Sequence, residues 1–258
     1  MTLATQGAGV RIPGGPWLVR DLDLAAQPGR VTVVVGPNGS GKTTLLRGLV
    51  GARPLDAGTV TIEGRAMADL PPRERARRLA YLPQSTPLVH DLDVRELVSL
   101  GRAPYLSRIA GPRDADRAAV DDALAAVQAR DLADRRVTTL SGGERQRVMI
   151  ARMLATGATT LVMDEPTAAL DVAHVLSLLA LVRRLADEGH AVVAALHDLD
   201  LARRHGDDAL CLLADGKGGH RFGAATDVLN PDDLARVFGV DVTLQGDALR
   251  FSLRAPDP

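Results

Sequence analysis

The sequence has little cysteine, lysine or aromatic residue. A single cysteine among 258 residues excludes an internal disulfide, and aromatic residues make up only 2% of the chain. Because Cys211 lies in the apolar run Ala209–Leu213, we predict that it is a buried core thiol. Nearly all basic residues are arginine, and Lys42 and Lys217 are the only lysines. A surface arginine therefore carries little functional information here, whereas the rare residues carry more.

Long apolar runs and an excess of one charge are also absent. The 31 basic and 32 acidic residues give a formal net charge of −1, which argues against a nucleic-acid-binding protein. Apolar runs such as Val175–Val182 are far shorter than the ~20 residues of a membrane-spanning helix. The first residues do not resemble a secretory signal. We therefore expect a soluble, cytosolic protein whose membrane role would come through partners.

A glycine-rich segment follows a predicted buried strand. Val31–Val35 is entirely β-branched, and the residues from Thr44 to Val50 have helical character. The segment between them fits G-x-x-x-x-G-K-[ST], whose backbone N–H groups surround phosphates. A turn that merely caps the helix is the alternative. The predicted nucleotide-binding residues are Gly36, Pro37, Asn38, Gly39, Ser40, Gly41, Lys42, Thr43 and Thr44, with Lys42 on the β- and γ-phosphates and Thr43 on Mg²⁺.

Two further apolar strands end in polar residues. Thr160–Met163 runs into Asp164 and Glu165, and Ala191–Leu196 runs into His197. Ligands bind at the carboxyl ends of parallel strands. We therefore predict that Asp164 holds Mg²⁺, directly or through water, and that Glu165 polarises the attacking water.

The same strand ends also admit structural interpretations. An exposed turn is the alternative for the acidic pair, and His197 is either a structural residue or a group that orients the water. The spacing of the other histidines does not suit a metal site.

A second predicted anion-binding segment lies between the predicted strands Val31–Val35 and Thr160–Met163. Leu140-Ser141-Gly142-Gly143-Glu144-Arg145-Gln146-Arg147 precedes an apolar helix over Val148–Leu154. Ser141 is a good helix N-cap, and the N–H groups of Gly142 and Gly143 form an anion site. A chain that binds one nucleotide has no obvious use for two such sites.

The L-S-G-G-E segment with Q-R after it resembles the signature of ABC-type ATPases. Other motifs of that family follow in the expected order. They are the phosphate loop Gly36–Thr43, Tyr81-Leu82-Pro83-Gln84, the signature, Leu161–Glu165 with Pro166-Thr167, Ala169-Leu170-Asp171 and His197. Together they extend from about Val31 to Asp198, and the ordered set is far more specific than any one motif.

The resemblance implies an α/β fold with three parts. It comprises a P-loop ATPase core with a mostly parallel sheet, an N-terminal antiparallel β subdomain and an inserted α-helical subdomain. We expect one ABC ATPase domain over 1–258, with the nucleotide-binding core at 1–83 and 159–258 and the helical signature subdomain at 84–158. Within these parts we expect short strands before residue 63, helices at Leu92–Leu100, Asp116–Val127 and Val175–Leu185, and a last helix at Pro231–Phe238.

The resemblance also implies a head-to-tail homodimer that holds two ATP molecules between its subunits. Ser141, Gly142 and Gly143 would then face the γ-phosphate bound by the partner's Lys42, which accounts for the second anion site. Gln84 would touch Mg²⁺ and the water, and Asp171 would organise the dimer interface. The catalytic residues implied are Glu165, His197, Gln84 and Lys42, and the Mg²⁺ ligands implied are Thr43, Gln84 and Asp164.

The adenine contact departs from the family pattern. The family often places an aromatic ring about 29 residues before the phosphate-loop lysine, a register that falls on Pro13 here. Trp17, the only tryptophan, lies four residues later. It either stacks on adenine through a shifted loop or belongs to the core, and we favour the core.

Two segments are similar to importers of iron chelates, haem and vitamin B12. They are Gly101-Arg102-Ala103-Pro104-Tyr105, in a region that docks on membrane subunits in the family, and Val228–Val240. The resemblance implies an ATP-hydrolysing subunit at the cytoplasmic face of the bacterial plasma membrane. Its partners would be two integral membrane permease subunits and a periplasmic or extracellular substrate-binding protein, and no nucleic acid. A soluble non-transport ABC ATPase and an exporter are the alternatives, and the cargo, a siderophore or haem iron complex or cobalamin, is not encoded in this chain.

Overall fold

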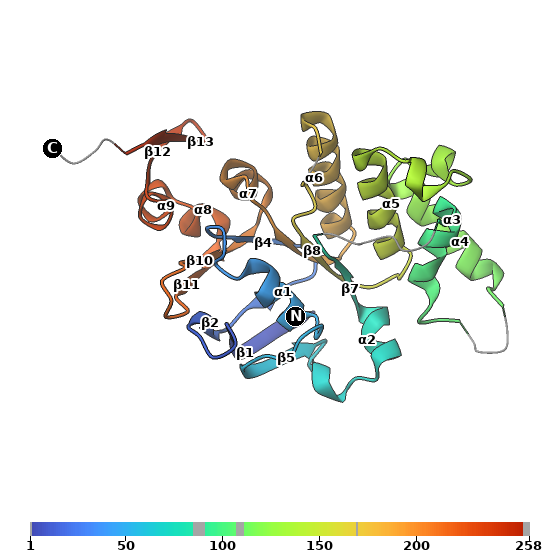
Figure 1. Ribbon diagram of the computed structural model, residues 1–258, viewed down its shortest axis with the longest axis horizontal. Coiled ribbons are helices and arrows are strands. Elements are labelled where there is room, and N and C mark those ends of the chain that lie inside the picture. The colour runs from blue at the N-terminus through green and yellow to red at the C-terminus, as the bar shows by residue number, and fades with distance from the viewer. Residues whose placement is uncertain (1, 85–90, 107–110, 169, 255–258) are drawn as a thin grey trace.

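A six-stranded sheet forms the centre of the molecule. The computed structural model describes residues 2–84, 91–106, 111–168 and 170–254 (Figure 1). The strand order is β11-β10-β4-β9-β8-β7, with only β11 antiparallel to its neighbour. These strands are β4 Val31–Val35, β7 Leu79–Leu82, β8 Thr160–Asp164, β9 Ala191–Ala195, β10 Asp208–Leu212 and β11 His220–Ala224.

The strands of this sheet are buried on both faces, as their continuous apolar sequences predict. Alternate residues belong to different cores, because side chains alternate across a strand. In β4, Val33 and Val35 belong to one core and Val34 to the other. Cys211 of β10 is 2% exposed, which confirms the predicted buried thiol.

An antiparallel sheet covers one face of the central sheet. Its order is β2-β1-β5-β6, with β3 paired to β1. Three leucines of the first helix, Leu45, Leu46 and Leu49, fill the core between the two sheets. The elements of this part are β1 Leu3–Arg11, β2 Trp17–Leu22, β3 Ala25–Ala26, α1 Lys42–Leu49, β5 Ala57–Ile62, β6 Arg65–Ala66, the 3₁₀ turn η1 Met67–Asp69 and α2 Pro72–Arg78.

Three helices gather at the side of the molecule farthest from β11 (Figure 1). They are α3 Val94–Ser99, α4 Asp114–Ala126 and α5 Gly142–Leu154, joined by the 3₁₀ turns η2 Leu100–Arg102, η3 Arg130–Leu132 and η4 Val137–Thr139. Asp93 caps α3 in a capping box with Glu96. The apolar side of α4, with Val120 and Leu124, packs into the larger core. The subdomain boundaries given above stay a prediction.

The rest of the chain covers the second face and ends in a hairpin. These elements are α6 Val172–Asp187, α7 Leu199–His205, α8 Ala225–Val228, α9 Pro231–Phe238, β12 Val240–Gln245 and β13 Ala248–Leu253. The β12–β13 hairpin projects from the body beside α9 (Figure 1). Across the described residues, no helix combines the length and apolar character needed to cross a bilayer.

Candidate functional site

The loop between β4 and α1 has a backbone that requires glycine at two positions. Gly36 and Gly41 have φ values of +155° and +99°. A Cβ on Gly36 would lie 2.7 Å from Ser40 Oγ, and one on Gly41 would lie 2.8 Å from Leu18 Cβ. Because neither approach is sterically acceptable, the loop keeps its tight curvature only with glycine.

The Lys42 side chain, at the end of this loop, bonds back to the residues at its start. Its Nζ donates hydrogen bonds to Gly36 O at 2.8 Å and to Pro37 O at 3.3 Å. Burial lowers the pKa of Lys42, while the charges of Glu165 and Asp164 act in the opposite direction. The ammonium group is thus buried next to two carboxylates, at a loop suited to phosphate.

Asp164 lies at the end of β8 and is 1% exposed. Thr43 Oγ1 donates to Asp164 Oδ1 at 3.1 Å, and the Tyr81 hydroxyl donates to Oδ2 at 3.3 Å. Burial raises the pKa of Asp164, and the two hydroxyl hydrogen bonds oppose this effect. Burial, with the Asp164 charge, raises the pKa of Tyr81 to about 12, so this hydroxyl remains a donor.

Glu165 brings together the ends of three neighbouring strands. Its Oε1 lies 2.5 Å from His197 Nε2, beyond β9, and its Oε2 accepts a hydrogen bond from the Gln84 amide, beyond β7. Glu165 is 8% exposed and has φ +52°, a left-handed conformation that costs a non-glycine residue free energy. A strained conformation persists where surrounding contacts hold the residue in place, and the contacts with His197 and Gln84 hold Glu165.

The residues around Asp164 fit a magnesium ion by their chemistry. Mg²⁺ prefers oxygen ligands and is commonly held by one or two protein groups together with phosphates and water. The Thr43 hydroxyl and the Asp164 carboxylate already lie 3.1 Å apart, and Gln84 bonds through its amide to Glu165, the next residue after Asp164. Nowhere in the described ranges, this site included, do three or more His, Cys, Asp or Glu residues form a group suited to a metal, so the fit here rests on the hydroxyl and the single carboxylate.

A cavity of about 330 Å³ adjoins the phosphate loop. It is lined by Ile12, Leu18, Asn38, Gly39, Gly41, Lys42, Thr43, Thr44 and Glu165. Its apolar wall is therefore formed by Ile12 and Leu18, which the sequence analysis missed. The sequence signal that could have indicated Ile12 is its place next to Pro13, where the aromatic register was expected.

Trp17 does not line this cavity. Its ring lies against Gly9, where a Cβ would approach it to 2.8 Å, and the guanidinium groups of Arg11 and Arg20 each lie 5.6 Å from a ring centroid. Trp17 is half-buried and belongs to neither hydrophobic core, so the core position that we favoured is wrong.

The signature residues form a separate, exposed group. Ser141 caps α5: its Oγ accepts from Glu144 N at 3.3 Å, and Glu144 Oε2 accepts from Ser141 N at 2.8 Å. Asp171 caps α6 in the same way, with Oδ1 accepting from His174 N at 2.9 Å. In the part of the chain that the structure describes, no hydrogen bond joins Ser141, Gly142, Gly143 or Asp171 to the phosphate loop. Within one chain, the predicted site residues therefore fall into two groups.

The two groups are connected through the backbone after Glu165. Gln146 of α5 donates from Nε2 to Pro166 O at 2.9 Å, which ties the signature helix to the end of β8. The two sequence-predicted anion sites are thus parts of one packed structure, although they do not face each other.

This protein has a glycine-rich loop between the buried parallel strand β4 and the helix α1, and an acidic residue, Asp164, ends β8 of the same sheet. These features define a P-loop nucleotide-binding protein. The family model for ABC transporters matches residues 19–168, more than half of the chain, and the chain belongs to that family. The resemblance drawn from the sequence motifs is therefore confirmed.

Two proteins similar to this chain are import ATP-binding proteins. The chain is 46% identical over 237 residues to the hemin import ATP-binding protein HmuV of Pseudomonas entomophila, covering 90% of this chain and 91% of the relative. It is 44% identical over 248 residues to the cobalamin import ATP-binding protein BtuD of Halobacterium salinarum, covering 96% of this chain. The chain spans only 61% of the length of that second relative.

Solved structures confirm the predicted fold class. A metal-chelate type ABC transporter in an inward-facing conformation superposes with a TM-score of 0.83 at 25% identity, covering 97% of this chain and 95% of that one. A dimeric bacterial ABC transporter cassette superposes with a TM-score of 0.75 at 26% identity, covering 86% and 98%.

Proposed function

We propose that this chain is the ATP-binding and ATP-hydrolysing subunit of an ABC importer for haem, cobalamin or a siderophore iron complex. The observation that carries the proposal is the convergence of Gln84, Glu165 and His197 beside a phosphate loop whose lysine and threonine adjoin Asp164. The identity of 46% to a hemin import protein and of 44% to a cobalamin import protein supports the cargo class.

In this proposal the phosphate loop binds the triphosphate. The N–H groups around Gly39 and Gly41 and the start of α1 would face the phosphate oxygens. The Lys42 ammonium would exchange its bonds to Gly36 O and Pro37 O for bonds to the β- and γ-phosphates. The remaining predicted nucleotide-binding residues are Gly36, Pro37, Asn38, Ser40, Thr43 and Thr44.

Thr43, Asp164 and Gln84 would hold Mg²⁺. When bound, the ion would neutralise charge on the β- and γ-phosphate oxygens. The hydroxyl of Tyr81 holds Oδ2 of Asp164 and so orients Oδ1 toward Thr43.

Glu165 would accept the proton of the attacking water. Because one oxygen contacts His197 and the other accepts from Gln84, the carboxylate is fixed in orientation before the reaction. His197, whose side chain is half exposed, would contact the γ-phosphate and the same water. Because the Glu165 carboxylate is already fixed, the phosphate and the water would have to move to it when the site closes.

A homodimer would complete each site. The signature residues Ser141 and Gly142, which are exposed, and Gly143, which is half-buried, would bind the ATP held by the partner subunit, and Asp171 would lie at the interface. ATP binding would then favour the closed dimer, and hydrolysis would reopen it. The motion would be passed to two integral membrane permease subunits, with a periplasmic or extracellular binding protein delivering the cargo to the other side of the bacterial plasma membrane.

Transport in vesicles tests this function. We would reconstitute the chain with its co-purifying membrane protein and supply ATP inside the vesicles with hemin, cobalamin or a ferric siderophore outside, together with a binding protein for that ligand. ATP-dependent accumulation of one ligand is the expected result. Efflux in place of uptake would favour an exporter, and co-purification with ribosomes or DNA would favour a non-transport ATPase.

A further inference from the structure

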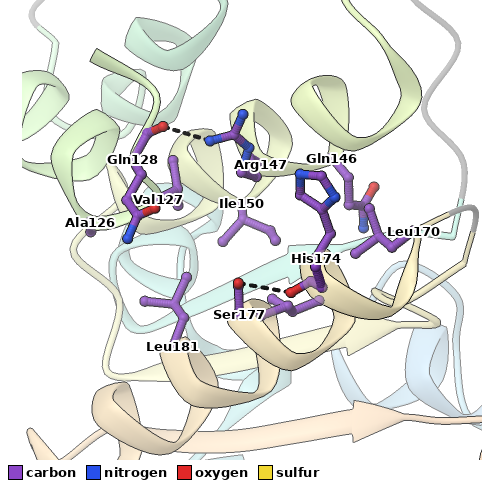
Figure 2. Close-up of a pocket in the computed structure, with 12 residues that line it drawn as sticks. Ala126, Val127, Gln128, Gln146, Arg147, Ile150, Leu170, His174, Ser177 and Leu181 are labelled. Carbon is purple, nitrogen blue, oxygen red and sulfur yellow. Dashed lines mark hydrogen bonds between the residues drawn. The ribbon is translucent and has the colours of Figure 1, made fainter. Parts of the chain in front are cut away.

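His174 of α6 contacts Asp171 and lies beside Gly143, two residues that the proposed function assigns to the partner's ATP. A Cβ built on Gly143 would meet three ring atoms at 3.8 Å, so the ring borders the space that the glycine leaves open. The same ring lies 2.8 Å from Asp171 through Nδ1. Figure 2 shows the ring directed from α6 toward α5, near Gln146 and Leu170.

The hydrogen bonding to Asp171 fixes the ring. Asp171 Oδ1 accepts from the backbone N of His174 at 2.9 Å and from Nδ1 at 2.8 Å. These bonds hold the pKa of Asp171 below its usual value, so the carboxylate is ionised at neutral pH. Because an ionised carboxylate only accepts, Nδ1 carries the proton and Nε2 points away from Asp171.

Packing alone would not hold the ring in this place. The ring borders a cavity of about 180 Å³ between α5 and α6 (Figure 2), with Ile150, Leu178 and Leu181 among its apolar lining residues. These side chains offer no hydrogen-bond partner to an imidazole, and polar side chains of the same lining are bonded elsewhere: Gln146 to Pro166 O, Arg147 to Gln128 O and Ser177 to Ala173 O. The orientation of the ring is therefore set by Asp171, and the position of the ring in turn limits how Asp171 and Gly143 move relative to each other.

We propose that His174 is a positioning residue that holds Asp171 and the signature glycine Gly143 in one arrangement, so that both meet the partner's nucleotide together. This inference rests on the proposed function, because it needs a head-to-tail dimer. It predicts that a substitution at His174 slows ATP hydrolysis on the partner's phosphate loop. Nucleotide binding by the phosphate loop of the substituted chain itself should not change.

Three substitutions separate the two contacts of the ring. His174→Phe keeps a ring but removes the donor to Asp171, His174→Asn keeps an N–H near the position of Nδ1 but removes the ring, and His174→Ala removes both. Ser177→Ala is the matched control, because Ser177 lines the same cavity and its hydroxyl is bonded only to Ala173 O on its own helix.

ATPase kinetics and thermal unfolding of the purified chain give the readout. We expect kcat to fall about tenfold in all three variants, with KM for ATP and the melting temperature unchanged, because the arrangement needs both the ring and its bond to Asp171. Ser177→Ala should match the wild type. A wild-type kcat in the Phe or the Asn variant, or a change confined to KM, would overturn the inference, while a wild-type chain without ATPase activity would overturn the proposed function itself.

Mixed dimers test whether the action crosses the subunit boundary. With Lys42→Ala and His174→Phe in different chains, the remaining intact phosphate loop faces an intact His174. With both substitutions in one chain and a wild-type partner, that loop faces the substituted residue. We expect the second dimer to hydrolyse ATP about tenfold more slowly than the first. Equal rates or the reverse order would overturn the inference.

Discussion

The hydroxyl of Thr43 donates to Oδ1 of Asp164 at 3.1 Å across 121 positions of sequence. The contact joins the first turn of α1 to the end of β8, two strands away from β4 in the central sheet. It brings a hydroxyl and a carboxylate, both oxygen ligands, to one point beside the phosphate loop.

The first prediction concerns the metal requirement that follows from this contact. Thr43→Val removes the hydroxyl at nearly constant volume, and we expect the Mg²⁺ concentration for half-maximal ATPase activity to rise on the order of tenfold. Thr43→Ser keeps the hydroxyl and should stay close to the wild type. Titration of ATPase activity with Mg²⁺ measures both, and an unchanged requirement in the Val variant would remove Thr43 from the metal site.

The second prediction concerns the attacking water. Glu165→Gln removes the proton acceptor but keeps the shape, so we expect kcat to fall by about 10²–10⁴-fold while ATP remains bound. A nucleotide-bound dimer should accumulate in gel filtration. Glu188→Gln, the same chemical change at an exposed residue, is the control. Unimpaired hydrolysis by Glu165→Gln would defeat the assignment of the general base.

The third prediction concerns the shape of the phosphate loop. Gly41 and Gly39 both have positive φ, but a Cβ would clash with Leu18 only at Gly41, whereas nothing lies within 4 Å at Gly39. Gly41→Ala combines backbone strain with overpacking, so we expect it to weaken nucleotide binding at least about tenfold more than Gly39→Ala. Nucleotide titration by calorimetry measures the difference. Equal losses would mean that strain, not the contact with Leu18, sets the requirement for glycine.

The fourth prediction concerns pH. Burial raises the pKa of Cys211 to about 11 from 9.0, so the folded state disfavours the thiolate. A thiol reagent at pH 8 should therefore label the native chain at least about 100-fold more slowly than the unfolded chain.

The same shift has a definite sign for stability. Because the unfolded thiol ionises first, the stability contribution is fully present below pH 9.0 and is lost as pH rises through about 11. Cys211→Ala should remove that part of the alkaline decline in melting temperature. Rapid labelling of native protein would contradict the buried position of Cys211.

The fifth prediction concerns the Gly101–Tyr105 segment. The guanidinium of Arg102 pairs with Asp116 at 3.0 Å, donates to Ala155 O at 2.9 Å and lies 3.8 Å from the Tyr105 ring centroid. We expect Arg102→Ala to lower the melting temperature by several degrees, because it leaves these groups without their partner. Arg117→Ala, which breaks the exposed pair with Asp114, should change it little. Equal effects would show that the segment does not join the helices.

Sequence patterns were sufficient to predict where the site residues at the ends of strands would lie. Asp164 and His197 follow buried strands of a parallel sheet, so their placement at one edge follows from topology. The predicted last helix, Pro231–Phe238, matches α9, since Asn230 caps it and Gly239 ends it. Such features are local in sequence and are encoded by short motifs.

Contacts between distant side chains were not predictable in this way. The bond from Tyr81 to Asp164, the positive φ of Glu165 and the apolar wall of Ile12 and Leu18 all depend on packing between separate elements. In the sequence, nothing marked His174 as functional except that it follows Asp171 by three positions, because a histidine in a helix is most often structural. The composite nature of the site came from family resemblance rather than from residue chemistry.

The central strands divide their side chains between two hydrophobic cores. Val34 packs toward the antiparallel sheet, while Val33 and Val35 pack toward the helices. Each strand that ends in a chemically important residue must therefore satisfy two independent sets of neighbours at once. A consequence is that a change of side-chain volume along these strands disturbs the packing that places a strand end, whereas a change in the β12–β13 hairpin, which projects from the body, leaves that packing alone.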